Sequence, residues 1–205
     1  MQKSKAVGTF IQICHAITKL RTAQKLISSL ICNLEKNFVA AGIENPDDGP
    51  RGSPVYIWDQ RNPQAPVRQY VESHTDTVTD LQIHPNLPNL LLSASTDGLV
   101  NIFDITQAEE DDALYQVINH RSAIARAGFM FPTTDIYAMG TDETLSFYAL
   151  QSQEEEKEEP APKAYGDTRE QLGCEYLAKM HWAGDKAYIA TGKHRYVSFS
   201  PNVNI

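Results

Sequence analysis

Ser-Thr-Asp-Gly-Leu-Val-Asn-Ile-Phe-Asp-Ile, which occupies residues 95–105, has a counterpart later in the chain. Residues 140–150 read Gly-Thr-Asp-Glu-Thr-Leu-Ser-Phe-Tyr-Ala-Leu and align with it without a gap. The same spacing towards the N-terminus places Val-Tyr-Ile-Trp-Asp, residues 55–59, under residues 100–104. Trp58, Phe103 and Tyr148 therefore occupy equivalent positions, 45 residues apart, in three consecutive units.

Each unit has room for four short strands. Asp97-Gly98 favours a tight hairpin turn, because such turns need positive φ angles, and apolar runs flank it on both sides. Four-stranded units that recur about every 40–45 residues are typical of β-propeller blades. We therefore predict an all-β fold, a partial propeller of about three and a half blades over residues 26–205. The predicted strands of the best-defined unit cover residues 78–84, 90–95, 99–105 and 113–118.

The ends of the chain are harder to assign. Residues 26–42 fit a pair of strands that completes the first blade, but apolar residues also recur at helical spacing from Phe10 to Leu34. Residues 1–25 therefore form a separate N-terminal segment, for which a helix and a basic targeting presequence both remain open. Residues 176–200 predict a further partial unit. Residues 151–163, QSQEEEKEEPAPK, are acidic and proline-rich and predict a disordered loop between blades.

Composition narrows the classes of function. The chain has 205 residues, 41% of them hydrophobic, and a formal net charge of −8. An acidic chain argues against a nucleic-acid-binding surface, and no stretch is long and apolar enough to span a membrane. Cys14, Cys32 and Cys174 form neither a disulfide framework nor a zinc-ligand spacing. We expect a protein of a reducing compartment, the cytoplasm or the nucleus, with no metal and no cofactor.

Two residues recur with the repeat, a histidine before the first strand and an aspartate in the second turn. They are His74 with Asp97, and His120 with Asp142. Together with the Trp58-Asp59 and Phe103-Asp104 closures they resemble the WD-repeat family. Residues 68–105, 109–120 and 166–192 are similar, within that family, to WD repeat-containing protein 89 and its fungal homologues.

The resemblance implies a seven-bladed propeller without enzymatic activity. About three and a half units fit into this chain, so we expect either that another copy or a partner completes the ring or that the chain is a truncated gene product. In such blades the histidine ring donates to the aspartate, and a serine and a tryptophan extend the chain of contacts. Ser93 or Ser95 fits the serine position, whereas Phe103 and Tyr148 replace the tryptophan; Phe103 has no N–H to donate, so its network should be shorter.

A shorter motif suggests a partner. Trp58-Asp59-Gln60-Arg61 resembles the Trp-Asp-x-Arg motif of WD-repeat substrate receptors of cullin-RING ubiquitin ligases, although Gly52-Ser53-Pro54 stand where an acidic residue is expected upstream. The resemblance implies that Arg61 contacts the ligase adaptor and that Trp58 and Asp59 shape the turn. The alternative is an arginine that only pairs with a neighbouring surface carboxylate.

No catalytic constellation accompanies these motifs. Cys174, His181 and His194 lack metal-ligand spacing, and the acidic runs at residues 47–48 and 109–112 look like solvated surface rather than a paired acid and base. We therefore predict a non-catalytic scaffold that binds other proteins. A substrate receptor of a cullin-RING ligase is the narrower version; a scaffold in a nuclear or ribosome-assembly complex, or a truncated product with little function, is the alternative.

Overall fold

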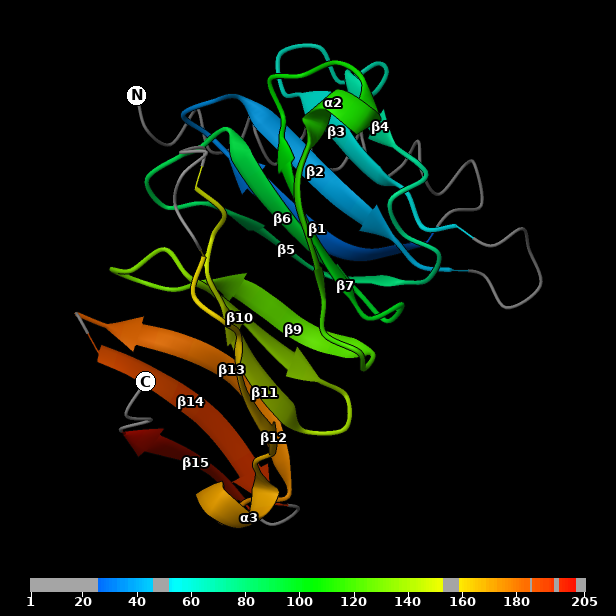
Figure 1. Ribbon diagram of the computed structural model, residues 1–205. Helices are drawn as coiled ribbons and strands as arrows, with labels where there is room; N and C mark the ends of the chain where they lie inside the picture. Colours follow the sequence, from blue (N-terminus) through cyan, green and yellow to red (C-terminus); the bar gives the residue numbers. More distant parts are fainter. Residues whose placement is uncertain (1–25, 46–51, 153–158, 185, 194–195, 202–205) are drawn as a thin grey trace.

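The computed structural model describes residues 26–45, 52–152, 159–184, 186–193 and 196–201, which form four antiparallel sheets stacked face to face (Figure 1). The first three sheets have four strands and the fourth has three, so the predicted three and a half blades are confirmed. Blade 1 consists of β1 (Ile27–Asn33), β2 (Phe38–Ile43), β3 (Val55–Asp59) and β4 (Arg68–Tyr70). Blade 2 consists of β5 (Val78–Ile83), β6 (Leu90–Ser95), β7 (Leu99–Asp104) and β8 (Leu114–Asn119), with the short helix α2 (Glu110–Ala113) before β8.

Blade 3 and the partial blade 4 follow the same order of strands. Blade 3 consists of β9 (Ile124–Phe129), β10 (Ile136–Gly140), β11 (Thr144–Tyr148) and β12 (Lys163–Asp167). Blade 4 consists of β13 (Tyr176–Ala183), β14 (Lys186–Lys193) and β15 (Tyr196–Pro201), and the helix α3 (Arg169–Leu172) precedes it. The first strands β1, β5 and β9 adjoin one another, so they form the inner side of the stack.

The core lies between the blades rather than inside any one of them. Every residue of β2, β6 and β10 is buried. Neighbouring sheets cover both faces of β6 and β10, whereas β2 meets blade 2 on one face and contributes Ala41 and Ile43 to a cluster within blade 1 on the other. Blades 1 and 2 share an apolar cluster that includes Ile57, Leu91 and Phe103. The opposite face of blade 2 contributes Leu92 and Ile102 to a cluster shared with blade 3. Alternate residues of one strand therefore serve two interfaces.

A bulge recurs in the first strand of each described blade, and in blades 1 and 2 its side chain bonds to the next blade. The pairing register shifts at Ser28 in β1, at Thr79 in β5, at Ala125 in β9 and at Ala178 in β13. The Ser28 hydroxyl donates to the Val78 carbonyl at 2.6 Å, and the Thr79 hydroxyl donates to the Ile124 carbonyl at 2.8 Å. Val78 and Ile124 begin the next first strand, so the same hydrogen bond ties blade 1 to blade 2 and blade 2 to blade 3.

The structure decides between the two alternatives left open for residues 26–42: residues 27–33 form the strand β1, which pairs with β2 along its length. The outer strands β4 and β12 were not predicted. The proposed N-terminal helix, residues 1–25, lies outside the described residues, as do residues 153–158 of the acidic segment, whereas Lys163 belongs to β12.

We expect Thr79→Val to lower the free energy of unfolding by about 0.5–1.5 kcal/mol, because the substitution removes the hydroxyl but keeps the shape of the side chain. Urea unfolding followed by circular dichroism measures the change. Thr75→Val, at an exposed position, serves as the control and should change stability by less than about 0.5 kcal/mol. Equal stabilities of the wild type and Thr79→Val would contradict the role of the hydroxyl between the blades.

Candidate functional site

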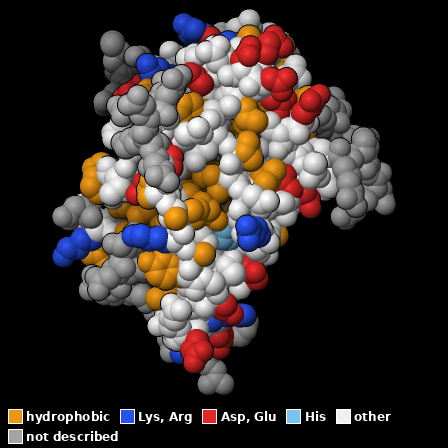
Figure 2. Space-filling model, viewed as in Figure 1, with side chains coloured by type: hydrophobic (Ala, Val, Ile, Leu, Met, Phe, Trp, Pro, Cys, Tyr) orange, Lys and Arg blue, Asp and Glu red, His pale blue; other side chains and the backbone are white. Residues whose placement is uncertain are grey.

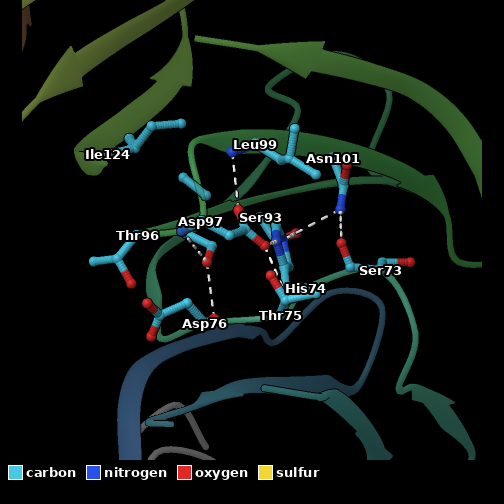
Figure 3. A network of polar contacts seen from close by, with 12 residues as sticks. Ser73, His74, Thr75, Asp76, Ser93, Thr96, Asp97, Leu99, Asn101 and Ile124 are labelled. Carbon is cyan, nitrogen blue, oxygen red and sulfur yellow. Dashed lines mark hydrogen bonds and ion pairs between the residues drawn. The ribbon is translucent and has the colours of Figure 1, made fainter. Parts of the chain in front are cut away.

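The His74 ring is the centre of a buried polar network in blade 2 (Figure 3). Its Nδ1 lies 3.0 Å from Asp97 Oδ2 and its Nε2 lies 2.7 Å from Ser93 Oγ. His74 is 2% exposed and Ser93 is fully buried. The ring therefore joins three parts of the blade: the loop before β5, the strand β6 and the β6–β7 turn. Of the two candidate serines, Ser93 is the one that contacts the histidine.

The Asp97 carboxylate accepts more than the histidine contact. The backbone N–H groups of Thr75 and Leu99 donate to it at 3.0 and 2.9 Å. Burial alone would raise the pKa of Asp97, but the His74 hydrogen bond and charge and the two N–H groups outweigh it and hold the pKa below its usual value. The carboxylate is therefore stabilised in its charged form, as a structural anchor of the turn.

The sequence analysis missed Asn101 in this network. The Asn101 side chain donates to the Ser73 carbonyl at 2.8 Å and lies 3.4 Å from His74 Nε2. Phe103, at the position expected for tryptophan, instead stacks on Tyr70 with ring centroids 4.4 Å apart. Asn101 thus supplies a polar contact that the phenylalanine cannot make. Asn101 lies opposite Ser93 in the β6–β7 ladder, and this pairing is the feature from which its role could have been predicted.

In blade 3 the histidine and the aspartate do not meet as expected. The His120 ring nitrogens contact Tyr148 Oη at 3.1 Å and Thr144 Oγ1 at 3.0 Å. The Thr144 hydroxyl in turn donates to Asp142 Oδ1 at 2.7 Å. Thr144 stands where blade 2 has Leu99, so its hydroxyl lies between the two groups. Tyr148 keeps a polar contact at the tryptophan position, with its hydroxyl on the imidazole.

Glu110 has a structural role that the sequence did not predict, since the acidic run at 109–112 was expected to be solvated surface. Figure 2 shows acidic side chains gathered around α2. The Glu110 carboxylate accepts the backbone N–H groups of Val71, Glu72 and Ser73 at 2.6 to 3.1 Å, and also the Ser73 hydroxyl. It therefore fixes the loop that leads to His74.

The Trp58–Arg61 segment lies where β3 ends. Trp58 is 2% exposed, in a cluster with Ala41 and Tyr56 on the face of blade 1 away from blade 2. The buried Gln60 side chain donates to the carbonyls of Asn33 and Phe38 at 3.2 and 2.9 Å. These two residues anchor the turn to the blade. Gln60 is a structural position that the motif did not reveal.

Arg61 points away from the blade and pairs with Asp59. Its Nε lies 2.9 Å from Asp59 Oδ1 and its Nη2 lies 2.6 Å from Asp59 Oδ2, while its backbone N–H donates to the same carboxylate at 2.8 Å. The Arg61 side chain is 74% exposed and that of Asp59 is 26% exposed. The hydrogen bond from Arg61 is the main reason that the pKa of Asp59 lies below its usual value. The structure therefore holds the guanidinium in one orientation while it faces solvent.

The contacts described for these side chains are structural: they connect strands and turns. Within the described part of the chain, no group of three or more His, Cys, Asp or Glu side chains is placed to hold a metal ion. The described helices are all too short or too polar to cross a bilayer. Both histidine networks lie inside blades, where they tie strands and turns together.

Four-stranded blades with these histidine networks define part of a WD-repeat β-propeller, and comparisons with known proteins agree. No family model matches the chain. It is 42% identical over 139 residues to an uncharacterized WD repeat-containing protein of Saccharomyces cerevisiae, a match that covers 68% of this chain and 34% of the relative. It is 36% identical over 85 residues to the WD repeat-containing protein 89 homolog of Dictyostelium discoideum, covering 41% of this chain and 24% of the relative.

The structural comparison gives the same fold. The β-propeller domain of Cps50 (Swd1) from Myceliophteria thermophila superposes with a TM-score of 0.58 at 16% identity, covering 82% of this chain and 50% of that one. The chain is thus a WD-repeat protein that contains part of a propeller. It spans less than half the length of the curated relatives that it matches.

We expect His74→Ala to lower the free energy of unfolding by about 1–3 kcal/mol, because Asp97 and Ser93 would lose a buried partner. Thermal and urea unfolding measure the loss. His181→Ala, on an exposed position of β13, is the matched control and should be close to neutral. An unchanged midpoint for His74→Ala would contradict the network in blade 2.

The His120 ring should make stability depend on pH. Burial lowers its pKa, against a smaller raising effect of Asp142, so the folded protein favours the neutral ring. Its contribution is then complete above the unfolded pKa of about 6.5 and is lost as the pH falls below that value, because only the unfolded state gains the proton.

A His120→Gln variant tests this dependence. We expect it to be less stable than the wild type at pH 7.5, and we expect the difference to shrink at pH 5. His84, whose pKa burial also lowers, is present in both proteins and cancels in the comparison. A difference that grows on acidification would show that the ring is protonated in the folded state.

Proposed function

We propose that this chain is a non-catalytic scaffold for protein–protein interaction, and that Arg61 is its contact for the adaptor of a cullin-RING ubiquitin ligase. The single observation that carries the narrower part is the Arg61 side chain, which is exposed yet held in a fixed orientation by Asp59. A planar guanidinium in one orientation loses little conformational freedom when it binds, and arginine is enriched at binding hot spots.

Arg61 keeps donors for a partner. A guanidinium has five N–H donors, and the described contacts of the Arg61 side chain use Nε and Nη2 towards Asp59. The Nη1 group has no contact within the described residues. Because Asp59 already balances the charge of Arg61, the exposed guanidinium is not an uncompensated charge at the surface. An adaptor carbonyl or carboxylate could therefore accept from Nη1 without breaking the existing pair.

The equivalent turn of blade 2 supports a specific role for blade 1. There Asp104 accepts the Thr106 backbone N–H and hydroxyl at 3.0 and 2.7 Å, so the turn has the same local form. Thr106 stands where Arg61 stands in blade 1. The turn therefore does not need an arginine to form, which leaves the exposed guanidinium available for a partner. The proposed place of action is the cytoplasm or the nucleus.

The test is co-purification of the tagged chain from its own cells, followed by mass spectrometry, for the wild type and Arg61→Ala. We expect a cullin-RING adaptor with the wild type and a loss of about tenfold or more with the variant, as for an interface hot spot. Because Arg61 is exposed, the melting temperature should hardly change.

Arg169→Ala is a matched control. Arg169 forms the same contacts with Asp167, two residues earlier, with Nη2 at 2.5 Å and Nε at 3.0 Å, but it is the first residue of α3, after the end of β12 in blade 3. It should leave adaptor recovery unchanged. Equal recovery by wild type and Arg61→Ala, or no adaptor in either, would contradict the receptor function and leave the broader scaffold function standing.

A further inference from the structure

A groove of about 400 Å³ lies between blades 1 and 2. It is at the end of the stack where β3 and β7 finish and where β2 and β6 begin, the upper end in Figure 1. Its volume is within the range of about 300–1,000 Å³ found for ligand pockets. Arg61 lies beside it, because its partner Asp59 is one of the lining residues.

The groove has an apolar floor and an apolar wall. Phe38 and Ile57 are 6% and 2% exposed and belong to the cluster that joins the two blades, with Ile105 packed against them. Val67 is 48% exposed and lies on the loop that leads into β4. A large aliphatic or aromatic side chain entering the groove would cover Val67 and contact atoms that the core already holds in place.

The charges at the groove are mainly positive. Lys36 and Arg68 line it, and neither is paired with a carboxylate among the residues whose positions are described. Arg68 instead donates to the carbonyls of Val67 and Gln107 at 2.8 and 2.7 Å, which fixes its guanidinium between the two blades. The Asp59 carboxylate also lines the groove, but its charge is balanced by Arg61. This local excess of cations stands out on a chain whose net charge is −8.

We propose that this groove binds a short segment of a partner protein in which a large apolar side chain is flanked by aspartate or glutamate residues. The apolar side chain fills the space above Phe38 and Ile57, and the carboxylates meet Lys36 and the fixed guanidinium of Arg68. Opposite charges at the rim of an apolar contact select the partner and speed its association. This inference does not depend on the identity of the protein that contacts Arg61.

The test is a selection from a displayed library of random 12-residue peptides against the purified chain. We expect the enriched peptides to combine Phe, Leu, Ile or Met with neighbouring Asp or Glu. Fluorescence polarisation with one labelled enriched peptide then measures affinity. Val67→Glu and Lys36→Glu change exposed side chains, so the fold should be kept, and each should weaken binding about tenfold, or 1.4 kcal/mol.

Two controls separate the groove from the rest of the surface. Val117→Glu changes an equally exposed valine, 51% exposed, on the outer strand β8, and Lys186→Glu reverses an exposed lysine in blade 4. Both should leave peptide affinity unchanged. Enrichment of basic peptides, no enrichment at all, or equal affinity of Val67→Glu and wild type would overturn the proposal. A failure of the proposed adaptor contact would be seen in the co-purification experiment instead, where Arg61→Ala would not change the recovery of the adaptor.

Discussion

The requirement that both faces of each sheet be buried governs this structure. Strands such as β2 and β6 have no residue that can face water, so a single four-stranded sheet of this sequence cannot be stable by itself. The hydrophobic effect stabilises the sheets only when they stack, with Leu91 turned towards blade 1 and Leu92 towards blade 3. The hydroxyls of Ser28 and Thr79 then fix the spacing between first strands. Blade order, turn positions and the groove between blades 1 and 2 all follow from this stacking.

The middle strands could be predicted because nearly all of their residues are buried, which produces dense apolar runs between turn residues. The outer strands β4 and β12 carry no such signal: β4 is only three residues long, Arg-Gln-Tyr, with Tyr70 alone buried, and Lys-Ala-Tyr-Gly-Asp of β12 is mostly exposed. The segment 27–33 fitted two periodicities, because Ile27, Ile31 and Leu34 share a helical face as well. Residues 27–33 form a strand because they pair with β2, and that pairing cannot be seen in the residues of the segment itself.

For the candidate sites, too, some contacts could be predicted from the sequence and others could not. The His74–Asp97 contact follows from the repeat, and the structure places both residues as the blade requires. The repeat also predicted that His120 would contact Asp142, but Thr144 at the Leu99 position and Tyr148 at the Phe103 position introduce hydroxyls that bond the His120 ring instead. Glu110 shows the opposite case: its sequence context is a charge run, and only the fold brings it to three backbone N–H groups. Repeats therefore locate positions, whereas the side chains at neighbouring positions decide the contacts.

The two Asp-x-Arg turns show why a short motif needs its structural context. Asp59 with Arg61 and Asp167 with Arg169 make nearly the same local contacts, so local geometry cannot assign a role to one and not to the other. Blade 1 differs in what surrounds the turn. Gln60 bonds it to two carbonyls of the β1–β2 connection, the tryptophan before it is buried, and an apolar groove with unpaired cations begins at Asp59. In the other pair both groups are about half exposed: the Asp167 side chain is 47% exposed and the Arg169 side chain is 49% exposed. A rigid turn beside an apolar groove is where a partner can gain both a directional hydrogen bond and buried area, and this combination distinguishes Arg61 from Arg169.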